Sequence, residues 1–269
     1  MPVQRDASGN RWVQAEVEVP GTPEQVWDAI ATGPGITSWF VPSQVDGRVG
    51  GTATSSFGPG MDAVATITEW DPPRRFVAEG QDDPGGPSVA TEWIVEARGG
   101  GTCVVRVVHR WFAESDDWDG QFEGHTYGWL SFFRVLRAYL DHFRGQHGAP
   151  VQVMGVTPPP REAAWEAWTR PLGLFGAEVG QRVSTPAGAP PLAGTVEWAG
   201  QPMWPEDLLI RLDAPAPGIA HLVPHPMGQI YLTMRLYLFG ADAASAAAEA
   251  EAAWQAWMNE HFAAVAAEA

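Results

Sequence analysis

The chain has 269 residues, 45% of them hydrophobic, which is normal for one large or two ordinary globular domains. Its 16 basic and 32 acidic residues give a formal net charge of −16, which repels phosphate backbones and anionic lipid headgroups, so we exclude nucleic acid as a partner. The single cysteine, Cys103, cannot form an intramolecular disulfide, and we therefore expect a reducing, cytoplasmic setting.

Targeting and cofactor motifs are missing from the sequence. The first residues contain no apolar h-region, and no stretch approaches the roughly 18 consecutive apolar residues of a membrane span. No zinc-ligand spacing, phosphate-binding glycine loop, nucleophile elbow or dinucleotide fingerprint occurs. The sequence therefore predicts no membrane partner, no metal and no cofactor.

The chain begins with a strand and a short helix. Residues 11–19 alternate between apolar and polar, which predicts a strand with one buried face. Thr22 can then cap a helix, with Pro23 at its first position and Gln25 completing a capping box. We expect residues 33–35, the sequence GPG, to end this helix, with no regular element after it before the next strand.

A run of strands and one long helix follow. The strand-like segments are separated by turn-forming residues such as GPG, DPP, DDPGG and RGGG. They are residues 48–57, 62–70, 74–79, 88–97 and 102–112. Strands at this spacing with no helix between them predict an antiparallel meander. Apolar residues at three- and four-residue steps then predict an amphipathic helix over residues 123–144.

The rest of the chain repeats this order in a shorter form. In this repeat EAAWEAW corresponds to EQVWDAI, GTVEW corresponds to ATITEW, and MNEHF corresponds to YLDHF. The aligned pairs are Trp27 with Trp165, Trp70 with Trp198, and His142 with His261. We place the boundary in GQHGAP, which gives domains of residues 1–147 and 148–269. The alternative is a single domain with an unrelated C-terminal extension.

Several longer segments of the first domain together carry a family resemblance. They are VPGTPEQVWDAI, ITSWFVP, VDGRVGG, ITEWDPPRRF, GTCVVRVVHRWF and HTYGWLSFFRVLRAYLDHF, in this order over residues 12–144. They resemble the SRPBCC or START superfamily, which includes the birch pollen allergen, and within it the bacterial branch related to the activator of the heat-shock-protein-90 ATPase.

The resemblance implies an α+β chain of two helix-grip domains. In each, a curved antiparallel sheet wraps around a long C-terminal helix, with a cavity between them. Residues 151–269 resemble the family only through the internal repeat and lack WFVP and DGRVGG equivalents. Whether this second, shortened domain keeps a pocket stays open.

His109 is the best single candidate for contacting a ligand. Alternation places Val105, Val107, His109 and Trp111 on one face of their strand, which is a mostly apolar face with one polar group. A neutral imidazole can hydrogen-bond a ligand hydroxyl or carbonyl, and it can exchange a proton near neutral pH. The alternative is a core histidine satisfied by a neighbouring group.

The other candidate ligand-binding residues are mainly aromatic. Trp39 and Phe40 follow a glycine-rich break, so we expect them on a loop over the cavity mouth, with packing beneath the sheet edge as the alternative. Met61, in FGPGMD, would form an adaptable rim. The aromatic residues expected between sheet and helix are Trp93, Trp111, Phe122, Tyr127, Trp129 and Phe133. We assign no catalytic residue.

Other charged residues have simpler interpretations. Arg106 and Arg110 are expected on the solvated outer face of the sheet. His221 and His225 have a spacing that could bind a metal, but no third ligand accompanies them, and we predict no metal there.

The sequence favours binding of a small hydrophobic or aromatic molecule, for transport, sequestration or sensing. The second domain would pack against the first as a pseudo-dimer. One alternative is a polyketide aromatase/cyclase-like enzyme, in which His109 and Tyr127 would move protons. The other is a co-chaperone-like module with a protein partner.

Overall fold

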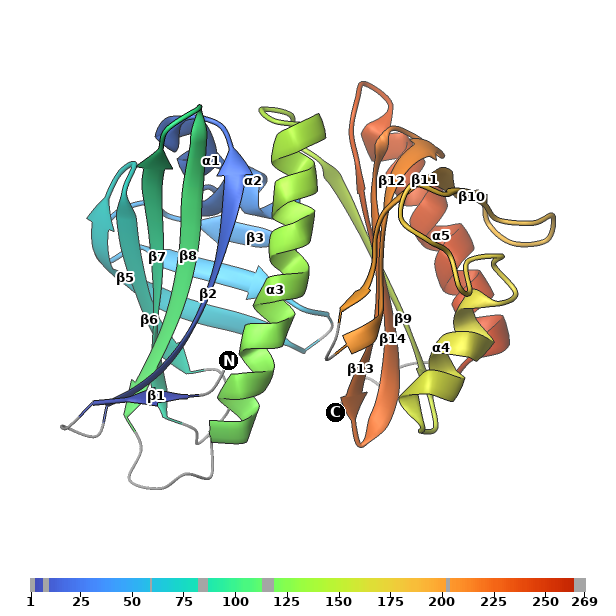
Figure 1. The fold of residues 1–269 in the computed structure, drawn as a ribbon, viewed down its shortest axis with the longest axis horizontal. Helices are drawn as coiled ribbons and strands as arrows, with labels where there is room; N and C mark the ends of the chain where they lie inside the picture. The colour runs from blue at the N-terminus through green and yellow to red at the C-terminus, as the bar shows by residue number, and fades with distance from the viewer. Residues whose placement is uncertain are drawn as a thin grey trace. The chain divides into compact units, whose positions relative to one another are not determined.

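The chain folds into two compact units, Met1–Gly145 and Gln146–Ala269. The structure, a computed structural model, describes residues 3–6, 10–58, 60–81, 87–112, 119–201 and 204–263, without the side chains of residues 81, 112, 119–127 and 201. Each unit contains one antiparallel sheet and a long helix at its C-terminal end (Figure 1). This confirms the predicted α+β plan of two helix-grip domains.

The first unit has an eight-stranded sheet in the order β1-β2-β8-β7-β6-β5-β4-β3. Its strands are β1 (Gln4–Arg5), β2 (Asn10–Pro20), β3 (Ser43–Val45), β4 (Thr52–Ser56), β5 (Asp62–Asp71), β6 (Arg75–Gln81), β7 (Ser88–Arg98) and β8 (Thr102–Phe112). Its helices are α1 (Pro23–Ala31), α2 (Gly33–Thr37) and α3 (Asp119–His142). The sheet arches beside α3, which starts near β1 and runs toward α1 and α2 (Figure 1).

The start of α1 has the predicted capping box. The Gln25 backbone N–H donates to Thr22 Oγ1 at 3.4 Å, and the Thr22 backbone N–H donates to Gln25 Oε1 at 3.0 Å. Two of the N–H groups that have no acceptor inside the helix are thereby satisfied.

A second short helix, α2, follows α1 where the sequence predicted no regular element. Thr32 has extended backbone angles and ends α1, and its Oγ1 accepts from the backbone N–H of Gly35 at 3.1 Å to cap α2. Pro34 is compatible with this position because the first helical turn needs no proline N–H. A Cβ on Gly35 would lie 2.0 Å from the Asp28 carbonyl oxygen, so glycine allows the two helices to approach.

The last turn of α1 is closed by side chains from the segment that follows it. Thr32 Oγ1 donates to the Asp28 carbonyl at 2.8 Å, and Trp39 Nε1 donates to the Ala29 carbonyl, also at 2.8 Å. The last carbonyls of a helix have no N–H donor inside the helix and need one from outside it. Trp39 is 0% exposed, so its indole both fills the core and caps the helix.

The second unit repeats the plan with a six-stranded sheet in the order β10-β11-β12-β13-β14-β9. Its elements are β9 (Ala149–Thr157), α4 (Arg161–Thr169), β10 (Arg182–Ser184), β11 (Ala193–Gln201), β12 (Trp204–Ala214), β13 (Gly218–Met227), β14 (Gln229–Leu238) and α5 (Ala243–His261). In both units the first long strand pairs with the last one, as β2 with β8 and β9 with β14. Trp165, Trp198 and His261 lie in the elements that the repeat predicts, namely α4, β11 and the end of α5.

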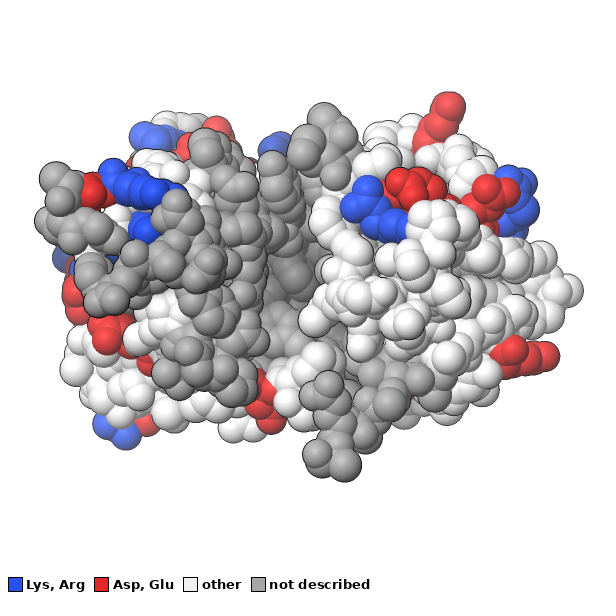
Figure 2. Space-filling view, turned by 90° about the horizontal axis from the view of Figure 1, so that it is seen from below, with Lys and Arg blue, Asp and Glu red and all other residues white. Residues whose placement is uncertain are grey.

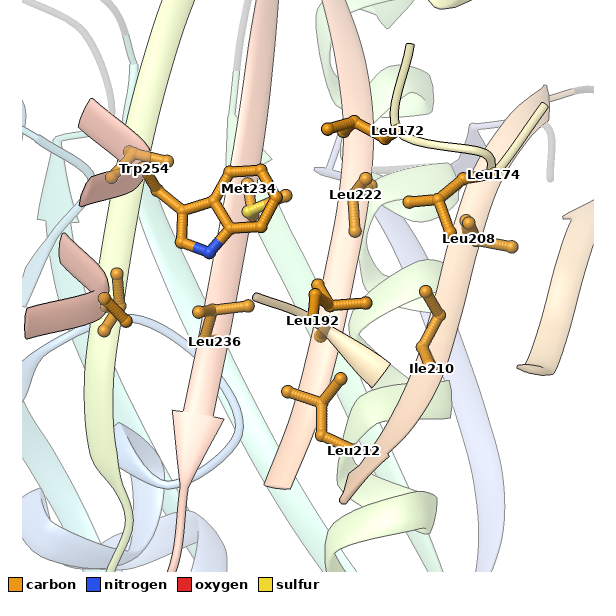
Figure 3. Close-up of a cluster of buried hydrophobic side chains, with 14 of the residues drawn as sticks. Leu172, Leu174, Leu192, Leu208, Ile210, Leu212, Leu222, Met234, Leu236 and Trp254 are labelled. Carbon is orange, nitrogen blue, oxygen red and sulfur yellow. The ribbon is translucent and has the colours of Figure 1, made fainter. Parts of the chain in front are cut away.

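The core of the second unit consists mainly of aliphatic side chains, with the buried tryptophans Trp168, Trp254 and Trp257 among them. Alternate residues of β12, β13 and β14 stand in cross-strand rows, such as Leu208, Leu222 and Met234. Figure 3 shows these side chains together with Trp254 of α5 and with leucines of the segment between α4 and β11. Among the described residues, no helix is both long and apolar enough to cross a membrane.

The role of Trp39 leads to a stability prediction. We expect Trp39→Phe to lower the free energy of unfolding by about 1–3 kcal/mol, because the buried Ala29 carbonyl loses its donor. Denaturant titration of the full chain measures this. The matched control is Trp165→Phe, at a half-buried position of α4, for which we expect a change within about 0.5 kcal/mol. Equal losses in the two variants would contradict the capping role.

Candidate functional site

The inner face of the first sheet combines apolar and polar side chains in three cross-strand rows. Odd-numbered residues of β2, β8 and β7 face α3, and all of those in the rows are buried except the half-buried Thr91. The rows are Arg11, Trp111 and Val89, then Val13, His109 and Thr91, then Ala15, Val107 and Trp93. The row that contains Arg11 lies toward the end of the sheet at which α3 begins (Figure 1).

His109 is hydrogen-bonded at both ring nitrogens. Thr91 Oγ1 lies 3.0 Å from Nδ1, and Trp129 Nε1 of α3 donates to Nε2. An indole N–H can only donate, so Nε2 of a neutral imidazole accepts and Nδ1 carries the proton, which it donates to Thr91. Of the two alternatives left by the sequence, this is the arrangement of an interior histidine satisfied by its neighbours.

Aromatic rings surround the His109–Trp129 contact. Trp129 stacks on Phe40 with ring centres 5.1 Å apart, and it meets Trp93 edge-on at 5.0 Å. Phe40 also contacts Phe132 of α3 at 4.4 Å. Trp39 and Phe40 are 0% and 7% exposed, so they pack in the interior and do not form an open loop over a mouth. The reason is that α2 turns both rings toward the sheet and α3.

The remaining predicted site residues are dispersed. Phe133 is buried, and its ring centre lies 6.2 Å from that of Trp93. Trp111 is buried in the row that contains Arg11. Met61 lies in the turn between β4 and β5 and is 38% exposed, outside this buried cluster. The side chains of Phe122 and Tyr127 belong to the first half of α3 and lie outside the described residues.

Arg11 is an inner-face residue that sequence analysis missed. It is 7% exposed and lies directly opposite Trp111, next to the His109 row. The alternation of residues 11–19 contained the signal, because residue 11 has the same parity as Val13. A guanidinium at this place adds a positive, multiply donating group to the inner face.

His221, one of the two histidines considered as metal ligands, lies beside a carboxylate. His221 Nε2 lies 3.3 Å from Asp207 Oδ1, with both side chains buried, so its charged neighbour is a carboxylate of β12. In the described part of the chain, no three His, Cys, Asp or Glu side chains are placed to hold a metal ion together.

The outer face of the first sheet carries ion pairs. Arg106 pairs with Glu16 at 3.0 Å, and Glu92 is held between Arg75 and Arg110 with its side chain only 6% exposed. Burial alone raises the pKa of Glu92, but the hydrogen bonds and charges of the two arginines outweigh burial and hold that pKa below its ordinary value. On the face drawn in Figure 2, acidic and basic side chains are likewise interspersed.

Each unit has one sheet that bends beside a long C-terminal helix. In the first unit, polar and aromatic side chains lie between the sheet and the helix. This arrangement defines a tandem helix-grip protein. Residues 12–142 match the model of the family described as polyketide cyclase/dehydrase and lipid transport. The match covers most of the first unit, which is therefore similar to this family. No curated protein sequence matches the chain.

Solved structures give fold-level likenesses at low identity. The di-domain ARO/CYC protein BexL, from the BE-7585A biosynthetic pathway, is 13% identical and covers 95% of this chain and 100% of its own, with a TM-score of 0.45. DynU16, from the dynemicin biosynthetic locus, is 18% identical over 92% of this chain and 95% of its own, at 0.42. The Aha1 dimer from Colwellia psychrerythraea is 19% identical and covers 50% of this chain and 98% of its own, with a TM-score of 0.41. None of these scores supports a function for this chain.

The Glu92 site predicts a pH dependence of stability. Because its pKa is lower in the folded state, ionised Glu92 stabilises the fold above the unfolded-state value of about 4.3, and this stabilisation is lost as the pH falls through the folded-state pKa. We expect Glu92→Gln to lower the free energy of unfolding by about 1–3 kcal/mol near neutral pH, with the difference shrinking as the pH falls below the unfolded-state value. The control Glu16→Gln, at an exposed pair, should cost less than about 1 kcal/mol at every pH. If the loss of unfolding free energy in Glu92→Gln did not vary with pH, Glu92 would not be ionised in the folded protein.

The hydrogen bonds of His109 predict its tautomer. We expect nitrogen-detected NMR of the full chain to find the proton of the neutral ring on Nδ1. The variant Trp129→Phe removes the donor to Nε2 and should shift the population toward the Nε2–H form. A ring that carries its proton on Nε2 in the unmodified protein would contradict the assignment.

Proposed function

We propose that the N-terminal domain binds a small, largely aromatic molecule between its sheet and α3. The observation that supports this most directly is the composition of the inner face, where Arg11, Thr91 and His109 stand among apolar side chains of β2, β8 and β7. Ligand sites in proteins are mostly apolar with a few polar groups that fix orientation, and this face has that composition.

The proposed ligand lies at the end of the inner face where α3 begins. At the other end, Trp39, Phe40 and Phe132 already fill the space beside α3. Arg11 and Trp111 stand at the α3-start end, where an arginine can pair with a carboxylate or enolate and an indole can stack on a flat ring. The ligand class is therefore a planar aromatic molecule with a carbonyl or acidic oxygen.

The hydrogen bonds at both ring nitrogens of His109 favour binding over proton transfer. A neutral imidazole has one N–H and one lone pair, and Thr91 and Trp129 engage both. A general base needs a lone pair within reach of the substrate proton. In the ligand-free arrangement His109 therefore acts as a polar wall of the site.

A ligand screen tests the proposal. We expect native mass spectrometry of the full chain with a library of naphthoquinones, anthraquinones and flavonoids to find at least one complex with one ligand per chain. Thr91→Val and Arg11→Met should weaken it by about tenfold, equivalent to about 1.4 kcal/mol, whereas Glu16→Gln on the outer face should leave it unchanged. Absence of any complex across the library, or equal affinity in all variants, would reject the site.

A polyketide cyclase-like reaction is the second candidate, because the description of the matching family includes such enzymes. It is distinguished from simple binding by His109→Ala. Retained binding with lost turnover of a poly-β-ketone substrate would assign proton transfer to His109, and unchanged turnover would remove it from the reaction.

A further inference from the structure

A hollow of about 830 Å³ lies at one end of the first sheet, and the strand residues that line it, apart from Trp111, point away from α3. Trp12 of β2, Arg110 of β8, Ala90 of β7 and Glu79 of β6 form one continuous cross-strand row. They have the opposite parity to Val13, His109 and Thr91, so this row is on the outer face. Trp111, which has inner-face parity, also lines the hollow, so the hollow borders the inner-face site proposed above but is formed mainly by outer-face residues. Its volume is in the range of small-molecule sites.

The floor of the hollow comes from a difference in side-chain size along this row. Ala90 ends at its methyl group, whereas its row neighbours Arg110 and Glu79 have long side chains. Trp12 adds a flat indole beyond Arg110, and Asn10 lines the same hollow from the start of β2. A compact ring can thus rest on Ala90 with Arg110 and, beyond it, Trp12 on one side and Glu79 on the other.

The polar groups around the floor retain hydrogen-bonding capacity. Within the described part of the chain, Arg110 uses Nη1 for Glu92, which leaves its Nε and Nη2 donors. Glu79 accepts from Thr68 through Oε1 at 3.2 Å, which leaves Oε2, and Asn10 donates through Nδ2 to Asp6 at 2.8 Å, which leaves Oδ1. Donors and acceptors therefore alternate around one small space.

We propose that this hollow is a binding site for a polyhydroxylated ring of the saccharide class. Each ring hydroxyl both donates and accepts, so neighbouring hydroxyls can pair with Arg110 and Asn10 on one side of Ala90 and with Glu79 on the other. The C–H face of such a ring is apolar and packs on the indole of Trp12. The carboxylates of Glu79 and Asp6 disfavour phosphorylated ligands, because like charges repel.

Ligand-observed NMR of the full chain with methyl glucoside, methyl mannoside, methyl galactoside and glucosamine tests the site. We expect saturation transfer to at least one of them and none to cyclohexanol, which has a ring of similar size but a single hydroxyl. Trp12→Ala and Glu79→Gln should each raise the dissociation constant about tenfold. Ala90→Leu, which fills the floor without removing a polar group, should abolish binding.

The matched control is Glu18→Gln, on the same outer face but outside the hollow, where Glu18 accepts from Thr102 at 2.7 Å. It should bind as the unmodified chain does. Thermal melting of each variant verifies that the fold is intact. No saturation transfer to any of the four sugars, or unchanged binding in both Trp12→Ala and Ala90→Leu, would overturn the proposal.

Discussion

The pairing of β2 with β8 is the constraint on which the first unit depends. β2 is made at the start of the domain and β8 near its end, yet they pair in continuous register from Asn10 opposite Phe112 to Pro20 opposite Thr102. Closing so long a loop costs chain entropy, which the buried inner face must offset. The same register decides that Arg11, His109 and Thr91 face α3, whereas Trp12, Arg110 and Ala90 face away from it.

The two units use one topology with different interiors. In the second unit, β9 pairs with β14 as β2 does with β8, but the rows that form its core consist of residues such as Val153, Met234 and Leu222. In the first unit the corresponding strands place an arginine, a threonine and a histidine beside apolar groups. Aliphatic packing confers stability without selectivity, whereas buried polar groups select what can lie against them. The first unit thus has polar side chains on the inner face of its sheet, whereas the hydrophobic cluster of the second unit does not include its buried Asp207 and His221.

Sequence patterns predicted the parts of this fold that depend on local periodicity. Alternation identified β2, β7 and β8, three- and four-residue spacing identified α3, and the repeat identified the tandem plan. Helix α2 was missed because the glycines of GPG were interpreted only as the end of α1, although Pro34 suits a first helical turn and Thr32 caps it. The burial of Glu92 was invisible because Arg75 and Arg110 come from strands on either side of β7, and a single sequence does not reveal cross-strand neighbours.

The hydrogen bond that Trp129 Nε1 donates to His109 Nε2 joins α3 to the sheet. If the carbonyl of a bound ligand accepted the indole N–H instead, the imidazole would regain an unused lone pair when the ligand bound. Basicity in this interior would then be a property of the occupied protein and would be suppressed in the empty one.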